Sequence, residues 1–176
     1  MSTLLRIAAG ILLALCIAVL FLLLFGLRGN AGVIESEVEI RRPAAAIYPY
    51  LVEPDSLKRW VGGLVSDSVL TDGGLRVGRR STQVMESRGG NIVLDCLVTG
   101  FERDHRLDML ISHPMISMHQ RLYLVESGGA TRVHYSGKVH YRGLLGRLLE
   151  PITTPGARTK IAGDMATLKR VVEAGK

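Results

Sequence analysis

Apolar residues recur at helical spacing near the end of the chain and predict a long amphipathic helix over residues 154–175, of about five turns. The stripe consists of Ile161, Met165, Leu168 and Val172. Thr154 is suited to the N-cap and Pro155 to the first helical position, while Gly175 stands where a C-terminal cap is expected. A separate short amphipathic turn over residues 144–150 is expected to stop at Pro151.

The middle of the chain alternates with a period of two and predicts antiparallel strands. In residues 32–40, Ile34, Val38 and Ile40 share one face. A short helix over residues 44–52 and a second one opened by Pro54, which carries Trp60, should follow. Further strands are predicted over residues 65–71, 77–87, 91–101, 106–112, 115–126 and 130–141, and the Gly-Gly and Asp-Gly turns indicate hairpins. We therefore expect an α+β fold in which the closing helix covers the apolar face of the sheet.

A continuous apolar segment without any charged residue runs from Ile7 to Leu27 and predicts an N-terminal membrane anchor over residues 1–30. As a helix it would be about 32 Å long, close to the thickness of the bilayer interior. A cleaved signal peptide is the alternative, with small residues at 29–31 as the cleavage site. The short N-terminal tail favours a single-pass protein whose domain, residues 31–176, lies on the extracytoplasmic side.

The charge of the chain is moderately positive, at +6. Arg6 and Arg28 flank the apolar segment, so the remaining 20 basic residues exceed the 16 acidic ones by four. This excess suits a domain near an anionic lipid surface. Because no basic run is interleaved with aromatic residues, we expect no nucleic-acid partner. Cys16 and Cys96 fall in the apolar segment and in a predicted strand, so they are not expected to form a disulfide.

Several stretches resemble the START/Bet v 1-like (SRPBCC) superfamily, especially its polyketide cyclase/dehydrase-like branch. The matching stretches are VEIRRPAAAIYPYLVEPDSLKRWVGGL, GFERDHRLDM, GGATRVHY, GLLGRLLEPI and MATLKRVVEA, within residues 32–174. The resemblance implies a helix-grip fold: a curved antiparallel sheet of about seven strands wrapped around the long C-terminal helix, with two short helices after the first strand. It also implies a cavity between sheet and helix for a hydrophobic small molecule or lipid.

Residue parity along the strands, the apolar stripe of the closing helix and the resemblance together select the candidate lining of that cavity. The candidates are Tyr48, Trp60, Met85, Met109, Ile111, Met118, Gln120, Tyr135, Ile161, Met165 and Leu168. Four of them are methionines, whose flexible thioethers suit a pocket that adapts to its ligand. The polar groups of Gln120 and Tyr135 could orient a ligand, bond to each other or bond to buried water. The alternative is that these side chains simply fill a core.

Catalytic motifs are missing from the sequence: it has no nucleophile elbow and no phosphate-binding loop. His134 and His140 would lie about 20 Å apart along one strand, too far to share a metal, although His119 could approach one of them. We therefore expect no catalytic residue, metal or cofactor, and a non-enzymatic ligand-binding module. Two alternatives stay open: a polyketide cyclase- or dehydratase-like enzyme using Tyr135 with Tyr48 or Gln120, and a protein-interaction domain with a filled core.

Overall fold

The computed structural model describes residues 3–26, 32–87 and 89–175. In chain order the elements are α1 (Thr3–Gly26), β1 (Gly32–Ile40), α2 (Ala44–Val52), α3 (Pro54–Leu57), β2 (Leu64–Val69), β3 (Arg80–Ser87), β4 (Gly90–Glu102), β5 (Arg106–His113), β6 (Ile116–Ser127), β7 (Ala130–Tyr141) and α4 (Gly143–Glu173). The strands and short helices lie close to their predicted positions. The predicted boundary between residues 30 and 31 falls outside the described residues.

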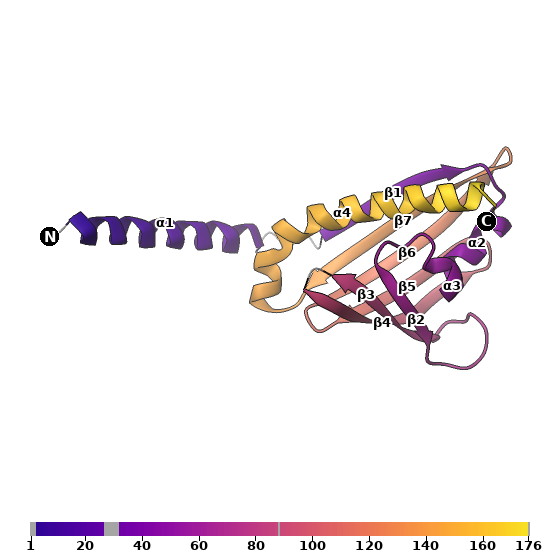
Figure 1. The fold of residues 1–176 in the computed structure, drawn as a ribbon, viewed down its shortest axis with the longest axis horizontal. Helices are drawn as coiled ribbons and strands as arrows, with labels where there is room; N and C mark the ends of the chain where they lie inside the picture. Colours follow the sequence, from indigo (N-terminus) through magenta and orange to yellow (C-terminus); the bar gives the residue numbers. More distant parts are fainter. Residues whose placement is uncertain (1–2, 27–31, 88, 176) are drawn as a thin grey trace.

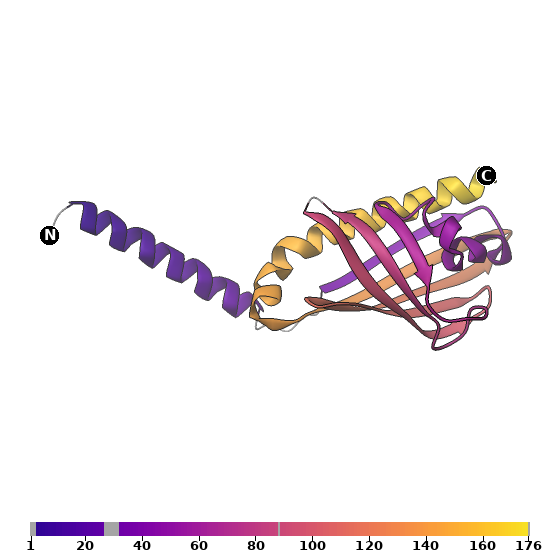
Figure 2. The ribbon, with the colours of Figure 1, turned by 60° about the horizontal axis from the view of Figure 1, so that its bottom comes forward.

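The strands form one antiparallel sheet of seven strands in the order β1-β7-β6-β5-β4-β3-β2. Strands β2 to β7 are a meander, as the turn signals predict, and β1 pairs with β7. Bulges between Leu64 and Ser66 and between Val98 and Gly100 add twist where β2 to β5 curl. The sheet curves around α4, which crosses its concave side (Figures 1 and 2). The predicted helix-grip fold is therefore confirmed.

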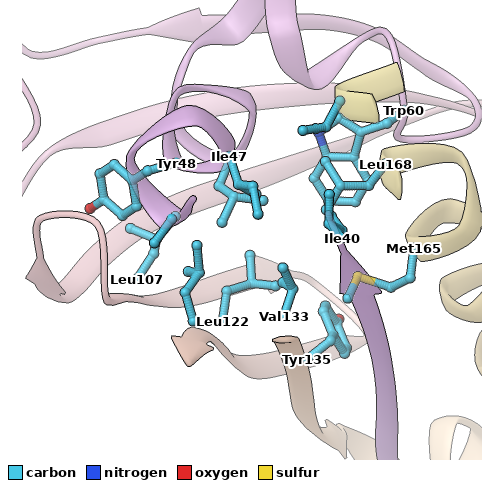
Figure 3. Packing of buried hydrophobic residues seen from close by; sticks show 14 of the residues in the cluster. Ile40, Ile47, Tyr48, Trp60, Leu107, Leu122, Val133, Tyr135, Met165 and Leu168 are labelled. Atoms are coloured by element: carbon cyan, nitrogen blue, oxygen red, sulfur yellow. The ribbon is translucent and has the colours of Figure 1, made fainter. Parts of the chain in front are cut away.

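A closed hydrophobic core fills the end of the grip where α2 and α3 lie beside the last turns of α4 (Figure 1). Ile47 and Leu51 of α2, together with Leu168 of α4, are 0–2 % exposed. They pack against inward-facing residues of the strands, including Leu122 and Val133 (Figure 3). Burying such aliphatic side chains contributes roughly 1.5–3 kcal/mol each, so this end holds the two layers together.

The closing helix is longer than predicted, because α4 begins at Gly143 and contains both Pro151 and Pro155. Thr154 is therefore not an N-cap; it is buried at 8 % exposure and its hydroxyl contacts that of Tyr141. Proline removes a helical N–H donor and bends a helix without necessarily ending it. The first turns of α4 accordingly run at a steep angle to the remainder (Figures 1 and 2). The C-terminal prediction is confirmed, since Gly175 has φ +65° and its N–H bonds to Val172.

Helix α1 extends away from the sheet (Figures 1 and 2). The apolar side chains whose burial is described there are exposed, with Leu12 at 65 % and Phe21 at 60 %. Within the described residues, we find no helix with both the length and the apolar character needed to cross a membrane. The predicted membrane-spanning helix over Ile7 to Leu27 is thus not supported. Leu27 and the candidate cleavage site at residues 29–31 lie outside the described residues.

Candidate functional site

The concave face of the sheet changes character along its strands. On β6, Leu124 and Leu122 are 4 % and 1 % exposed, whereas Gln120, Met118 and Ile116 on the same face are only half-buried. Helix α4 changes in the same way, from buried Leu168 and Met165 to half-buried Ile161 and Ala157. Solvent thus reaches apolar side chains between the sheet and the first half of α4.

This partly open region, which we call the inner concavity, contains most of the predicted methionines. It is lined by Met85, Met109, Ile116, Met118, Gln120 and Ile161, all half-buried. Met109 pairs with Gln120 across β5 and β6, and Met118 pairs with Ile111. Met165 is 1 % exposed and belongs to the closed core. The structure therefore brings Met109 and Met118 together on adjacent strands, where both pack against the core cluster that contains Met165.

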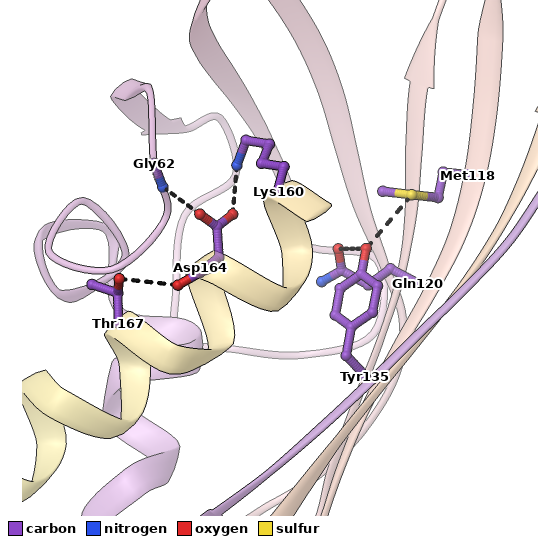
Figure 4. A network of polar contacts seen from close by, with 8 residues as sticks. Gly62, Met118, Gln120, Tyr135, Lys160, Asp164 and Thr167 are labelled. Carbon is purple, nitrogen blue, oxygen red and sulfur yellow. Dashed lines mark hydrogen bonds and ion pairs between the residues drawn. The ribbon is translucent and has the colours of Figure 1, made fainter. Parts of the chain in front are cut away.

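Tyr135 carries the polar group at the boundary between the closed core and the inner concavity (Figure 4). Its hydroxyl lies 3.4 Å from Gln120 Oε1 and 3.7 Å from Met118 Sδ. Burial raises the pKa of this phenol, and the charge of Asp164 raises it further, so Tyr135 is a hydrogen-bond donor at neutral pH. A Cβ at Gly137 would lie 3.2 Å from the Tyr135 hydroxyl. Glycine at this position therefore leaves room for the tyrosine ring. Of the roles left open for these two polar groups, the structure shows the hydrogen bond between Tyr135 and Gln120.

Asp164 joins α4 to the loop that leads into β2. Asp164 is only 7 % exposed. Its carboxylate accepts hydrogen bonds from the Gly62 N–H at 3.0 Å and from the Lys160 ammonium (Figure 4). A charge-assisted bond to a backbone N–H is stronger than a neutral one. The loop is therefore fixed against the helix beside the inner concavity.

Six of the predicted cavity residues lie in buried positions, and five of them are part of the core. Tyr48, Trp60, Tyr135, Met165 and Leu168 belong to the hydrophobic core cluster. The Trp60 indole N–H donates to the Tyr50 carbonyl at 2.8 Å, and the Tyr48 hydroxyl reaches the Arg106 carbonyl at 3.5 Å. Burial raises the pKa of Tyr48 as well. Ile111 is buried at 7 % exposure but stands outside that cluster, among the residues that border the inner concavity.

A polar group on the inner face of β2, β3 and β4 is not among the residues predicted from the sequence. Gln83 Nε2 donates to Asp67 Oδ2 at 3.4 Å, and Gln83 pairs with Leu94, which shares a face with Cys96. Burial raises the pKa of the Cys96 thiol to about 12, helped by the charge of Asp67 and opposed by a hydrogen bond with Ser81. The alternation of residues along the strands could have placed Gln83 and Cys96 on one face. The face of Asp67 could not be predicted in this way, because the bulge in β2 shifts its register.

The outer face of the sheet is polar and also hollowed. A depression of about 260 Å³ is lined by the outer-face residues Thr99, Asp108, His119, Arg121, Ser136 and Lys138, and it is also bordered by Met109 and Gln120, which line the inner concavity as well. Asp108 bonds to Arg121 at 2.7 Å and lies 3.6 Å from Arg106, so its carboxylate forms ion pairs on the outer face. The His119 and His140 rings are 6.1 Å apart, edge to face. In the part of the chain that the structure describes, no three potential metal-ligating side chains cluster.

Comparison with known proteins agrees with this geometry. A family model described as "Polyketide cyclase / dehydrase and lipid transport" matches residues 32–173. No match was found among curated proteins. Among solved structures, a Thermus thermophilus protein has a TM-score of 0.68 at 16 % identity, covering 82 % of this chain and 99 % of its own. A Deinococcus radiodurans protein has a TM-score of 0.59 at 21 % identity, covering 82 % and 99 %. Ara h 8.0201 has a TM-score of 0.60 at 13 % identity, covering 81 % and 97 %.

Proposed function

The chain belongs to the polyketide cyclase/dehydrase and lipid-transport family, and we propose from this premise that it binds a hydrophobic small molecule or lipid between the sheet and α4. The membership also confirms the predicted resemblance to the START/Bet v 1-like superfamily. One observation carries the proposal: apolar side chains of the inner concavity stay half-buried although they face the inside of the fold. Partly exposed apolar surface inside a grip is an energetic cost that a bound apolar molecule removes.

The lining suits a ligand with an apolar body. Met85, Met109 and Met118 present polarizable, flexible side chains that can adjust to different shapes. Each methylene buried there would contribute about 0.8 kcal/mol to binding. Tyr135 and Gln120 supply polar atoms at the inner end, where a polar substituent of the ligand could be oriented.

The binding function is tested by identifying what the full chain carries after gentle extraction. We expect lipid mass spectrometry of protein purified in mild detergent to show one enriched class of apolar molecule at a near-stoichiometric amount. The control is an unrelated protein with an exposed apolar helix, taken through the same extraction. Recovery of the same lipids in the same amounts from both proteins would contradict specific binding in the grip.

We propose in addition that α1 keeps the domain at a membrane, with the domain on the extracytoplasmic side. The support is that Leu12, Leu13 and Ile17 are each more than half exposed, an arrangement that water disfavours. Membrane association would also place the inner concavity near a supply of apolar ligands.

Replacing Leu13 and Ile17 by arginine is expected to move the full chain from the membrane fraction into the soluble fraction, because a charge in the bilayer interior costs about 2.5–3.5 kcal/mol. Membrane flotation measures the distribution, and protease protection of intact vesicles reports the side of the domain. Val65→Arg is the matched control, since this valine is 52 % exposed on the edge strand β2. Unchanged flotation of the double variant would refute anchoring through α1.

A further inference from the structure

One buried side-chain oxygen inside the fold has no hydrogen-bond partner among the described residues. Asp67 Oδ1 is buried and accepts no hydrogen bond from any residue that the structure describes. The second oxygen of the same carboxylate, Oδ2, accepts from Gln83 Nε2 at 3.4 Å. A buried acceptor left unsatisfied loses its hydration without compensation, and the loss is larger for a charged group. Buried acceptors without a partner are rare in folded proteins, so we expect a hydrogen-bond donor from outside the chain beside this oxygen.

The carboxylate of Asp67 lies on the inner face of the sheet. Asp67 pairs with Gln83 and Gln83 with Leu94, whose neighbour on the same face of β4 is Cys96. Cys96 in turn pairs with Ile111, and Ile111 with Met118, which lines the inner concavity. A continuous row of inward-facing residues therefore connects the unpartnered oxygen to the proposed ligand site.

The described side chains that interact with Asp67 are not cationic. The Gln83 amide is neutral, and the Cys96 thiol is held in its protonated form by burial and by the nearby Asp67 charge. None of the ion pairs formed by the described residues includes Asp67. An anionic ligand group would be repelled at this position, whereas a hydroxyl or ammonium group would supply the missing hydrogen bond.

We infer that Asp67 is a specificity residue: its Oδ1 accepts a hydrogen bond from a hydroxyl or amino group at one end of the hydrophobic ligand. The inference rests on the proposed function and narrows its ligand class. The grip should favour apolar molecules that carry a hydrogen-bond donor and disfavour fatty acids, whose carboxylate has no proton to donate at neutral pH.

The test compares probes that share one alkyl chain and differ only at the end. Native mass spectrometry of the full chain, released from detergent micelles, measures the binding of 1-dodecanol, dodecylamine, 1-methoxydodecane and dodecanoate. We expect the alcohol and the amine to bind about tenfold more tightly than the methyl ether, as for one hydrogen bond to a charged group, and dodecanoate to bind more weakly still. This comparison uses the unaltered protein and does not depend on the folding of a variant.

Asp67→Asn should reduce the preference for the alcohol over dodecanoate by about tenfold, mainly by improving dodecanoate binding. Asp95→Asn is the matched control, because Asp95 is exposed on the outer face of β4, and its probe preference should not change. Equal binding of the alcohol and its methyl ether would show that solvent satisfies Oδ1 and would overturn this inference while leaving ligand binding intact. Failure of every probe to bind would overturn the proposed function itself, and this inference with it.

Discussion

Leu168→Ala is expected to lower the free energy of unfolding by about 3 kcal/mol. Leu168 is 0 % exposed and lies where α4, α2 and the strands meet (Figure 3). Truncation there removes apolar contacts from both layers and leaves a cavity that the surrounding rigid elements cannot fill. Denaturant unfolding of the full chain in mild detergent, followed by the fluorescence of the single tryptophan Trp60, measures the change.

Ile152→Ala is the matched control for that prediction. It removes an aliphatic side chain of the same size from the same helix, at a position that is 69 % exposed. Its effect should stay within about 0.5 kcal/mol, as for an ordinary surface substitution. If both variants lost the same stability, the loss would not depend on burial, and the packing of the buried stripe of α4 would not be the reason the fold is stable.

The sequence predicts the structure correctly where the spacing of apolar residues follows the period of a strand or a helix. Ile34 and Ile40 alternate with glutamates, and their strand has the predicted bounds. Met165, Leu168 and Val172 follow the helical stripe and are buried at 1 %, 0 % and 3 %. In both cases one face of a regular element must leave water, so the spacing of apolar residues decides the side that is buried.

Local sequence signals predict the structure wrongly where contacts between distant parts of the chain determine it. Pro151 predicts the end of one helical turn and Pro155 the start of the next helix, yet the chain is helical on both sides of them, and Thr154 is buried against Tyr141. The position of Asp67 depends on a bulge that shifts the register of β2 against β3, and no spacing rule places such a bulge. The spacing of apolar residues selected candidates for the inside of the fold. It could not distinguish Met165, which fills the core, from Met118, which stays half-buried.

Met118→Trp is expected to weaken binding of 1-dodecanol about a hundredfold. Met118 is half-buried in the inner concavity, and its sulfur lies 3.7 Å from the Tyr135 hydroxyl. An indole at this position would occupy the space of three or four ligand methylenes, each worth about 0.8 kcal/mol of burial, and a loss of about 3 kcal/mol corresponds to that factor. Native mass spectrometry with the probe measures the affinity, and thermal unfolding shows whether the variant is folded.

Met115→Trp is the matched control: it makes the same exchange outside the inner concavity, where the larger side chain takes no space from the ligand. Met115 is 40 % exposed in the turn before β6, so the same exchange there should leave the affinity unchanged. Because side chains beside the inner concavity are only half-buried, the tryptophan at position 118 can be accommodated where a ligand would otherwise lie, and stability should fall little or even rise. A folded Met118→Trp variant with unchanged affinity would mean that the ligand binds elsewhere, and the polar depression on the outer face would become the next site to test.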